Sequence, residues 1–170
     1  TFLYAQGYYI GASLFEKDRL DVAQEIMLDC AKNQGQFHTP EDAIIADEMS
    51  DTADTLDVPI RDIEGEMKIF DIGKLTIERY TKIIRNSQTI LWNGPMGLYE
   101  HSPFKNGSEA IAKAMAETNA TTIVGGGDSV DCIKRAGYSR KDYTHISTGG
   151  GASLEFLSGT ELPGIKPLLN

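Results

Sequence analysis

The sequence predicts an α/β fold: a three-layer, doubly wound, Rossmann-like arrangement in which a parallel sheet carries helices on both faces. Two observations support this prediction. Three short apolar segments in the second half of the chain each end in a glycine-containing turn, and each turn precedes residues with helical apolar spacing. The segments lie at 89–92, 121–124 and 143–147. Strands that alternate with helices form parallel sheets, and such sheets bind ligands at the carboxyl ends of their strands.

The first half of the chain begins with a predicted helix. Residues 18–30 form an amphipathic helix in this prediction, and Gly35 follows as a stop signal. Residues 41–46 are a short apolar run behind Pro40, which is typical of a buried strand. The acidic residues between 47 and 57 predict an exposed loop.

A second strand is expected at 67–70 and closes at the turn Asp71-Ile72-Gly73. Thr76 is expected to cap the helix that follows, because threonine oxygens accept hydrogen bonds from first-turn amides. Further helices are expected after the three glycine turns, at 109–117, 129–136 and 152–157.

Composition narrows the class of protein. The chain has 170 residues, 41% of them hydrophobic, which predicts one globular domain. No apolar run is long enough to span a membrane and no secretory leader is present, so we expect a soluble, cytoplasmic protein. A formal charge of −9 argues against binding to nucleic acid or to an anionic membrane. Cys30 and Cys132 are expected to be buried free thiols.

Two triple-glycine turns, Gly125-Gly126-Gly127 and Gly149-Gly150-Gly151, are the strongest candidates for function. Glycines that enter a helix expose backbone N–H groups and let a phosphate approach, with the positive end of the helix dipole behind it. Such amides can take the place of lysines in binding a phosphate. Close packing of helix on strand explains one such turn equally well, but two successive turns favour anion binding.

Several other chemistries find no support. The motif GxGxxG requires glycine where Val130 and Leu154 stand, and no GxxxxGK[ST] occurs, which weakens the dinucleotide and P-loop hypotheses. No GxSxG motif and no obvious glycosidase acid pair is present. The histidines, His38, His101 and His145, show no metal-ligand spacing.

Polar side chains accompany the glycine turns. Asp128 either bridges Mg²⁺ to a bound phosphate or caps its helix, and the residues alone leave this open. The turn Asn93-Gly94-Pro95 either positions a sugar or phosphate, with Glu100 accepting from ribose hydroxyls, or is simply a tight turn held by Pro95.

Three long motifs, in this order, resemble phosphoglycerate kinase: LWNGPMGLYE at 91–100, VGGGDS at 124–129 and HISTGGGASLE at 145–155. Shorter matches at Thr1-Phe2-Leu3, at 10–14, at Asp71-Ile72-Gly73 and at Leu162-Pro163-Gly164-Ile165 extend the resemblance over essentially the whole chain. The chain is similar to most of the carboxyl-terminal, nucleotide-binding domain of that family.

The resemblance implies a glycolytic, reversible phosphoryl transfer from 1,3-bisphosphoglycerate to MgADP, which gives 3-phosphoglycerate and ATP. It implies that Leu14 lines the adenine pocket, that Glu100 binds the ribose, and that Asn93, Gly94 and Pro95 line the nucleotide site. It further implies that Gly126, Gly127, Asp128 and Ser129 hold the phosphates, with Asp128 binding Mg²⁺. The resemblance also implies that the amides of Gly125, Gly149 and Gly150 act in catalysis by donating to the transferring phosphoryl group, and that Gly151 binds the nucleotide.

The sequence also departs from the family. The glycine-rich segment with the family's nucleotide-binding lysine, and the amino-terminal domain that holds the phosphoglycerate, have no counterpart here, so we expect a fragment with very weak turnover. Lys74-Leu75 stands where the family usually has Pro-Lys, and residues 162–170 correspond to the segment that returns to the other domain. The full-length protein is expected to be a monomer. The alternatives are a dinucleotide-binding dehydrogenase module and a non-catalytic nucleotide-binding fragment.

Overall fold

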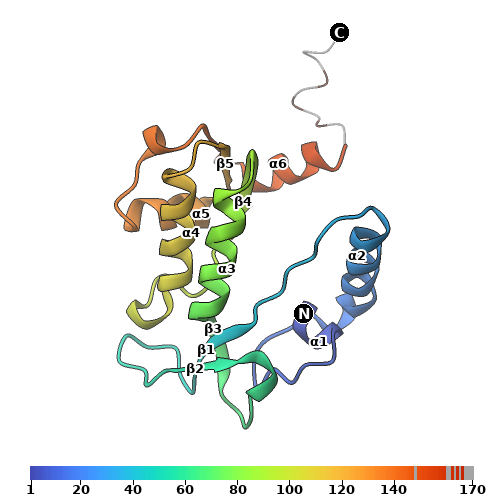
Figure 1. Ribbon diagram of the computed structural model, residues 1–170, viewed down its shortest axis with the longest axis vertical. Coiled ribbons are helices and arrows are strands. Elements are labelled where there is room, and N and C mark those ends of the chain that lie inside the picture. The colour runs from blue at the N-terminus through green and yellow to red at the C-terminus, as the bar shows by residue number, and fades with distance from the viewer. Residues whose placement is uncertain (148, 160–161, 163, 165, 167–170) are drawn as a thin grey trace. The chain divides into compact units, whose positions relative to one another are not determined.

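The computed structural model describes residues 1–147, 149–159, 162, 164 and 166 (Figure 1). Thr148, Pro163 and Ile165, which belong to motifs noted above, lie outside the described residues. The chain forms two compact units. The first unit comprises Thr1–Arg79 and Met96–Gly107, and the second comprises Tyr80–Pro95 with the described residues from Ser108 on.

The first unit contains an antiparallel sheet with the strand order β2-β1-β3. Strands β1 (Asp42–Ala46) and β3 (Lys68–Ile72) confirm the two predicted strands, and β1 is buried as expected. Strand β2 (Leu56–Pro59) was not predicted and lies at the end of the expected acidic loop. The parallel arrangement predicted from the second half therefore does not extend to these strands.

Two helices of this unit precede the sheet in the sequence. Helix α1 (Phe2–Ala5) is a single turn, and α2 (Leu20–Lys32), preceded by a 3-10 turn at Lys17–Arg19, confirms the predicted amphipathic helix. Two more 3-10 turns follow later, at Ile60–Asp62 and Ser102–Phe104. A cluster of buried apolar side chains holds the sheet, and it consists of Ala43, Ile45, Ile60 and Ile63.

A β-bulge interrupts the pairing of β1 with β3. Ile44 pairs with Asp71 but the next residue, Ile45, pairs with Ile69, so Phe70 is the extra residue. Because side chains alternate between the two faces of a strand, the bulge places Ile69 beside Ile45, on the face that packs in the core. Lys68 pairs with Ala46 and lies on the opposite face.

Helix α3 (Lys74–Arg85) is capped from β1, which corrects the prediction that Thr76 caps it. Thr76 lies inside the first turn and is fully buried. The Asp42 carboxylate accepts the amide of Leu75 at 2.7 Å and the amide and hydroxyl of Thr76 at 2.8 and 2.5 Å. A capping group supplied by a residue more than thirty positions away leaves no local sequence signal.

Asp71 plays a similar part for helix α4 (Asn106–Ala116). Its buried carboxylate accepts the amide of Gly107 at 2.8 Å and that of Ile72 at 2.8 Å. A side chain at Gly97 or Gly107 would collide with this carboxylate, so glycine is required there. Burial raises the pKa of Asp71 to about 6, because desolvation outweighs the two amide hydrogen bonds.

The second unit contains the predicted parallel sheet, with the strand order β4-β5-β6. The strands are β4 (Thr89–Asn93), β5 (Thr121–Gly125) and β6 (His145–Ser147). Helices α4, α5 (Gly127–Arg135) and α6 (Gly150–Leu157) alternate with them, and a 3-10 turn at Arg140–Asp142 precedes β6. The predicted Rossmann-like α/β class is thereby confirmed.

In the second unit, the residue just before the last residue of each strand belongs to the buried core. Trp92, Val124 and Ile146 pair across the three strands and are all buried, with 4%, 0% and 6% of their surfaces exposed. Ile133 of α5 is also buried. This packed row supports the strand ends that follow it. Cys132 is buried as predicted, whereas Cys30 is only half-buried, and both are free thiols.

Among the described residues, no helix combines the length and apolar character needed to cross a membrane.

Candidate functional site

The three parallel strands end in one row of paired residues. Asn93 pairs with Gly125, and Gly125 pairs with Ser147. The turns that leave this row carry both triple-glycine segments and the Asn93-Gly94-Pro95 turn. The structure thus brings together the predicted residues of the second unit, and these are Asn93, Gly94, Pro95, Gly125, Gly126, Gly127, Asp128, Ser129, Gly149, Gly150 and Gly151.

Two of these glycines are required by packing. Gly126 has φ of 89°, a conformation that side chains rarely adopt, and an added Cβ would lie 2.9 Å from Oδ1 of Asn93. At Gly150 an added Cβ would lie 2.7 Å from Cα of Gly126. The two glycine turns therefore touch each other through their backbones. The packing explanation considered from the sequence holds for this pair of residues.

Three other glycines have no such requirement. An added Cβ at Gly127 or Gly151 would meet no heavy atom within 4 Å, and at Gly149 it would make only ordinary contacts from 3.8 Å. None of these three has a positive φ. Glycine inside a helix costs up to about 1 kcal/mol relative to alanine. Open space over an exposed main chain is therefore the feature that these positions share.

Helices α5 and α6 both begin at the triple-glycine turns, and no side chain caps the first turn of either helix. The N-cap residues are Gly126 and Gly149, and neither helix has a side-chain hydrogen bond at its cap. First-turn amides have no partner inside a helix, so they need water or a ligand. Two uncapped helix starts beside each other offer positive dipole ends and N–H donors to an anion.

A buried serine holds the third turn in place. Gly94 has φ of 96°, and its amide donates to Oγ of Ser129 at 2.7 Å. Ser129 is fully buried in α5. This bond ties the end of β4 to the helix that follows β5. Ser129 thus organises the site through its side chain, a role that the motif alone did not indicate.

Asp128 is exposed in the first turn of α5. Among the residues described, no group of three or more histidine, cysteine, aspartate or glutamate side chains is arranged to hold a metal ion. A single free carboxylate fits Mg²⁺ in the way that nucleotide enzymes use it, since the ion keeps several waters and takes its other ligands from phosphate oxygens. It does not fit a structural metal held by protein alone.

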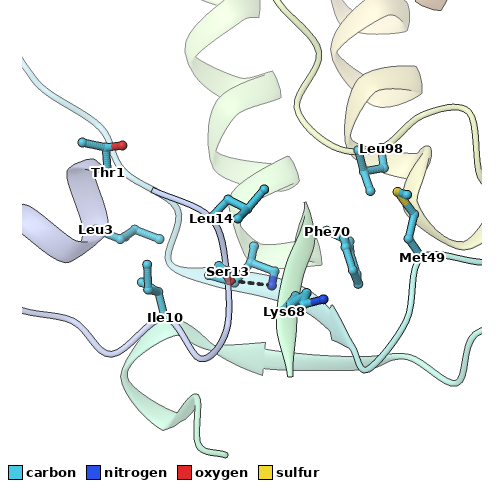
Figure 2. Close-up of a pocket in the computed structure, with 10 residues that line it drawn as sticks. Thr1, Leu3, Ile10, Ser13, Leu14, Met49, Lys68, Phe70 and Leu98 are labelled. Carbon is cyan, nitrogen blue, oxygen red and sulfur yellow. Dashed lines mark hydrogen bonds between the residues drawn. The ribbon is translucent and has the colours of Figure 1, made fainter. Parts of the chain in front are cut away.

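A separate, largely apolar pocket lies in the first unit (Figure 2). It has a volume of about 520 Å³ and includes Leu14, whose side chain is 98% exposed. Figure 2 shows Leu14, Phe70 and Leu98 around the pocket. The pocket residues are Thr1, Leu3, Ile10, Ser13, Leu14, Met49, Lys68, Ile69, Phe70 and Leu98.

Leu14, which was expected to line the adenine pocket, lies at this apolar pocket, and the sequence analysis named none of Phe70, Leu98 and Lys68, which also line it. Leu98 lies inside the motif at 91–100, so its position was a signal that could have been used. Phe70 and Lys68 left no signal, because they depend on the bulge in β3. Glu100 is exposed and, like Leu14, belongs to the first unit rather than to the unit with the glycine turns.

Comparisons with known proteins agree on one family. The sequence model described as Phosphoglycerate kinase matches residues 1–160. The chain is 44% identical over 170 residues to a phosphoglycerate kinase of Pelotomaculum thermopropionicum, covering 100% of the chain and 43% of that protein. It is 52% identical over 172 residues to the enzyme of Pelodictyon phaeoclathratiforme, covering 99% and 43%.

A solved structure of phosphoglycerate kinase from Coxiella burnetii is similar to this one with a TM-score of 0.92 and 41% identity, over 97% of this chain and 42% of that one. The chain thus spans less than half the length of the curated relatives that it matches.

Proposed function

Because the chain belongs to the phosphoglycerate kinase family, we propose that it carries the nucleotide side of a phosphoryl transfer between 1,3-bisphosphoglycerate and MgADP. In this proposal it is most of the carboxyl-terminal, nucleotide-binding domain. The phosphoglycerate binds to a domain outside this chain. The nucleotide, ADP or ATP, is the substrate, and Mg²⁺ accompanies it.

The observation that carries the proposal is the open space at Gly127 and Gly151. Packing explains why Gly126 and Gly150 lack side chains, but nothing in the described structure explains it at the other two positions. A phosphate that approaches the amides of two uncapped helix starts does explain it, because a Cβ would stand in its way. The nucleotide's phosphates would bind here.

The apolar pocket of the first unit takes the base in this proposal. Leucine side chains are normally buried, and one that is 98% exposed at a pocket is well placed to cover a flat aromatic ring. Leu98 of this pocket belongs to the same motif, at 91–100, as Glu100. Glu100, two residues further on, is proposed to accept the ribose hydroxyls.

The chemical role of these residues is positioning and charge stabilisation. Phosphoryl transfer spreads negative charge over the equatorial oxygens of the moving group, and fixed N–H donors stabilise that charge without reorganising. The amides of the glycine turns at 125–127 and 149–151 are proposed to serve as these donors. Mg²⁺ held by Asp128 would neutralise charge on the nucleotide's phosphates.

Calorimetric titration of MgADP into the chain tests the nucleotide site. Asp128→Ala is expected to weaken binding about tenfold or more, since it removes a charged partner of the metal-bound phosphates. Asp131→Ala is the matched control, because it removes the same charge one turn further along α5, where Asp131 pairs with Arg135 at 2.7 Å. Equal affinity of both variants would contradict the proposal. Tighter binding of NADH than of MgADP would favour a dehydrogenase module instead.

Catalysis requires a separate assay. A coupled assay on this chain alone is expected to show turnover at least about 10³-fold below that of a complete enzyme, from the size of single-donor deletions. Turnover near the complete enzyme's would mean that the chain needs no second domain.

A further inference from the structure

The chain contains two Asn-Gly dipeptides, Asn93-Gly94 and Asn106-Gly107. Asparagine followed by glycine is the pair most prone to spontaneous deamidation, because glycine has no side chain that hinders attack by its own amide nitrogen on the preceding carboxamide. Asn93 and Asn106 are both exposed, so water reaches them. What the structure does with the two glycine amides therefore decides whether each asparagine persists.

Deamidation at Asn93 needs no reagent other than water. The amide nitrogen of Gly94 attacks Cγ of Asn93, so that the N–Cγ bond forms, the Cγ–Nδ2 bond breaks, and Nδ2 leaves as ammonia with the proton that the Gly94 amide has lost. Water then opens the cyclic imide at one of its two carbonyls, which gives aspartate or isoaspartate at position 93. Because the nitrogen must lose its proton and turn toward Cγ, a bond that fixes its N–H in another direction opposes the reaction.

Both reacting groups at Asn93 are engaged elsewhere. The Gly94 amide donates to Oγ of Ser129 at 2.7 Å, and this hydroxyl is fully buried in α5. The Asn93 side chain lies at the glycine turns, since its Oδ1 would be 2.9 Å from a Cβ added at Gly126 and 3.7 Å from one added at Gly150. Asn93 is also the last residue of β4, which holds its backbone extended. A tertiary hydrogen bond thus locks the dipeptide.

The second dipeptide has a stronger lock. The Gly107 amide donates to the Asp71 carboxylate at 2.8 Å, and Gly107 is buried in the first turn of α4. Hydrogen bonds to an ionised acceptor are roughly twice as strong as neutral ones, and Asp71, with a pKa of about 6, is ionised in alkaline solution. Gly94 is only half-buried and its acceptor is a neutral hydroxyl. Asn93 is therefore the more vulnerable of the two asparagines.

We propose that Asn93 is a latent modification site, which deamidates when the hydrogen bond between Gly94 and Ser129 opens. The product carries a carboxylate in place of the carboxamide, beside the turns at Gly126 and Gly150. Like charges a few ångströms apart repel, so this carboxylate closes the glycine turns to a phosphate. That consequence rests on the proposed function, whereas the deamidation itself does not.

Peptide mass spectrometry of the chain, incubated in mildly alkaline buffer, tests the lock. Ser129→Ala is expected to raise the deamidation rate at Asn93 about tenfold, because the Gly94 amide loses its acceptor. The rate at Asn106 in the same sample reports on unfolding and should not change. Ser153→Ala is the matched control, since it removes a serine hydroxyl from α6 that bonds neither glycine amide. Equal acceleration at both asparagines would assign the effect to unfolding and refute the lock.

The unaltered chain provides a test that does not depend on how well a variant folds. In the folded chain Asn93 is expected to deamidate at least about tenfold more slowly than in urea, where the hydrogen bond to Ser129 is absent. Equal rates at Asn93 in the folded and unfolded chain would overturn the proposal.

Asn93→Asp carries the charge of the product and tests its consequence. Calorimetric titration is expected to show MgADP affinity at least about tenfold below that of the unaltered chain. Asn106→Asp adds the same charge at the other dipeptide and should retain the affinity. If Asn93→Asp binds MgADP as the unaltered chain does, the effect on phosphate binding is refuted and the modification site stands. If the unaltered chain binds no MgADP, that effect fails together with the proposed function, and the mass measurement still decides the modification.

Discussion

Gly127→Ala separates ligand approach from packing as the reason for glycine at the start of α5. An added Cβ would meet no heavy atom within 4 Å, and Gly127 is the first residue of the helix. Alanine is the better helix former and also restricts the unfolded chain. We therefore expect the variant to be as stable as the unaltered chain or more stable, by up to about 1 kcal/mol.

The effect on nucleotide binding should have the opposite sign. If a phosphate approaches the amide of Gly127, the new methyl group stands where the phosphate would lie. Loss of one hydrogen bond to a charged group corresponds to about 1.5–3 kcal/mol, or roughly a ten- to hundredfold weaker MgADP affinity.

Gly150→Ala is the matched comparison. Its Cβ would lie 2.7 Å from Cα and 3.0 Å from the amide nitrogen of Gly126, so the backbone must move. Overpacking of this kind costs about 1–3 kcal/mol, and we expect that loss of stability. Urea unfolding and calorimetric MgADP titration of both variants measure the two effects. The reasoning is refuted if Gly127→Ala leaves MgADP affinity unchanged while the variant folds normally.

Three further predictions concern buried polar groups. Burial raises the pKa of Asp71 from 3.8 to about 6, so as the pH falls its carboxylate takes up a proton in the folded chain before it does so in the unfolded chain. The free energy of unfolding, relative to that of Asp71→Asn, should therefore rise by up to about 3 kcal/mol as the pH falls from 7 through 6 toward 4. Urea unfolding at several pH values measures this difference, and a difference that stays constant with pH would contradict the prediction. Asp42→Ala should lower the free energy of unfolding by about 2–3 kcal/mol, because first-turn amides of α3 lose their acceptor. Asp29→Ala is the control: Asp29 is exposed, and its removal should cost at most about 1 kcal/mol in the same denaturation assay. Ser129→Ala should cost about 1–3 kcal/mol and weaken MgADP, because it leaves the Gly94 amide without its acceptor; unchanged unfolding would show that the bond does not hold the turn.

Local patterns in the sequence were sufficient for the parallel half of the fold. Apolar segments that end in glycine predicted β4, β5 and β6, and their common direction placed the three turns at one edge of the sheet. The end of a strand can be read from the local sequence, because the alternating side-chain pattern of the strand stops where glycine interrupts it. The candidate residues from Asn93 to Gly151 were therefore identified before their positions were known, although their roles stay proposals.

Tertiary contacts decided the rest. The antiparallel sheet and its bulge follow from how β3 pairs with a strand more than twenty residues away, and only that pairing moves Lys68 out of the core. The caps of α3 and α4 come from Asp42 and Asp71, which lie on strands and show no capping pattern.

The two glycine triplets illustrate the division most clearly. The sequence by itself determined that glycines follow β5 and β6, since composition and order are local properties. Which of them pack and which stand open depends on backbones that approach across the sheet, and the structure alone shows that Gly126 and Gly150 touch while Gly127 and Gly151 face empty space. Steric demand arises between parts of the chain that are distant in sequence, so no single stretch of residues contains it.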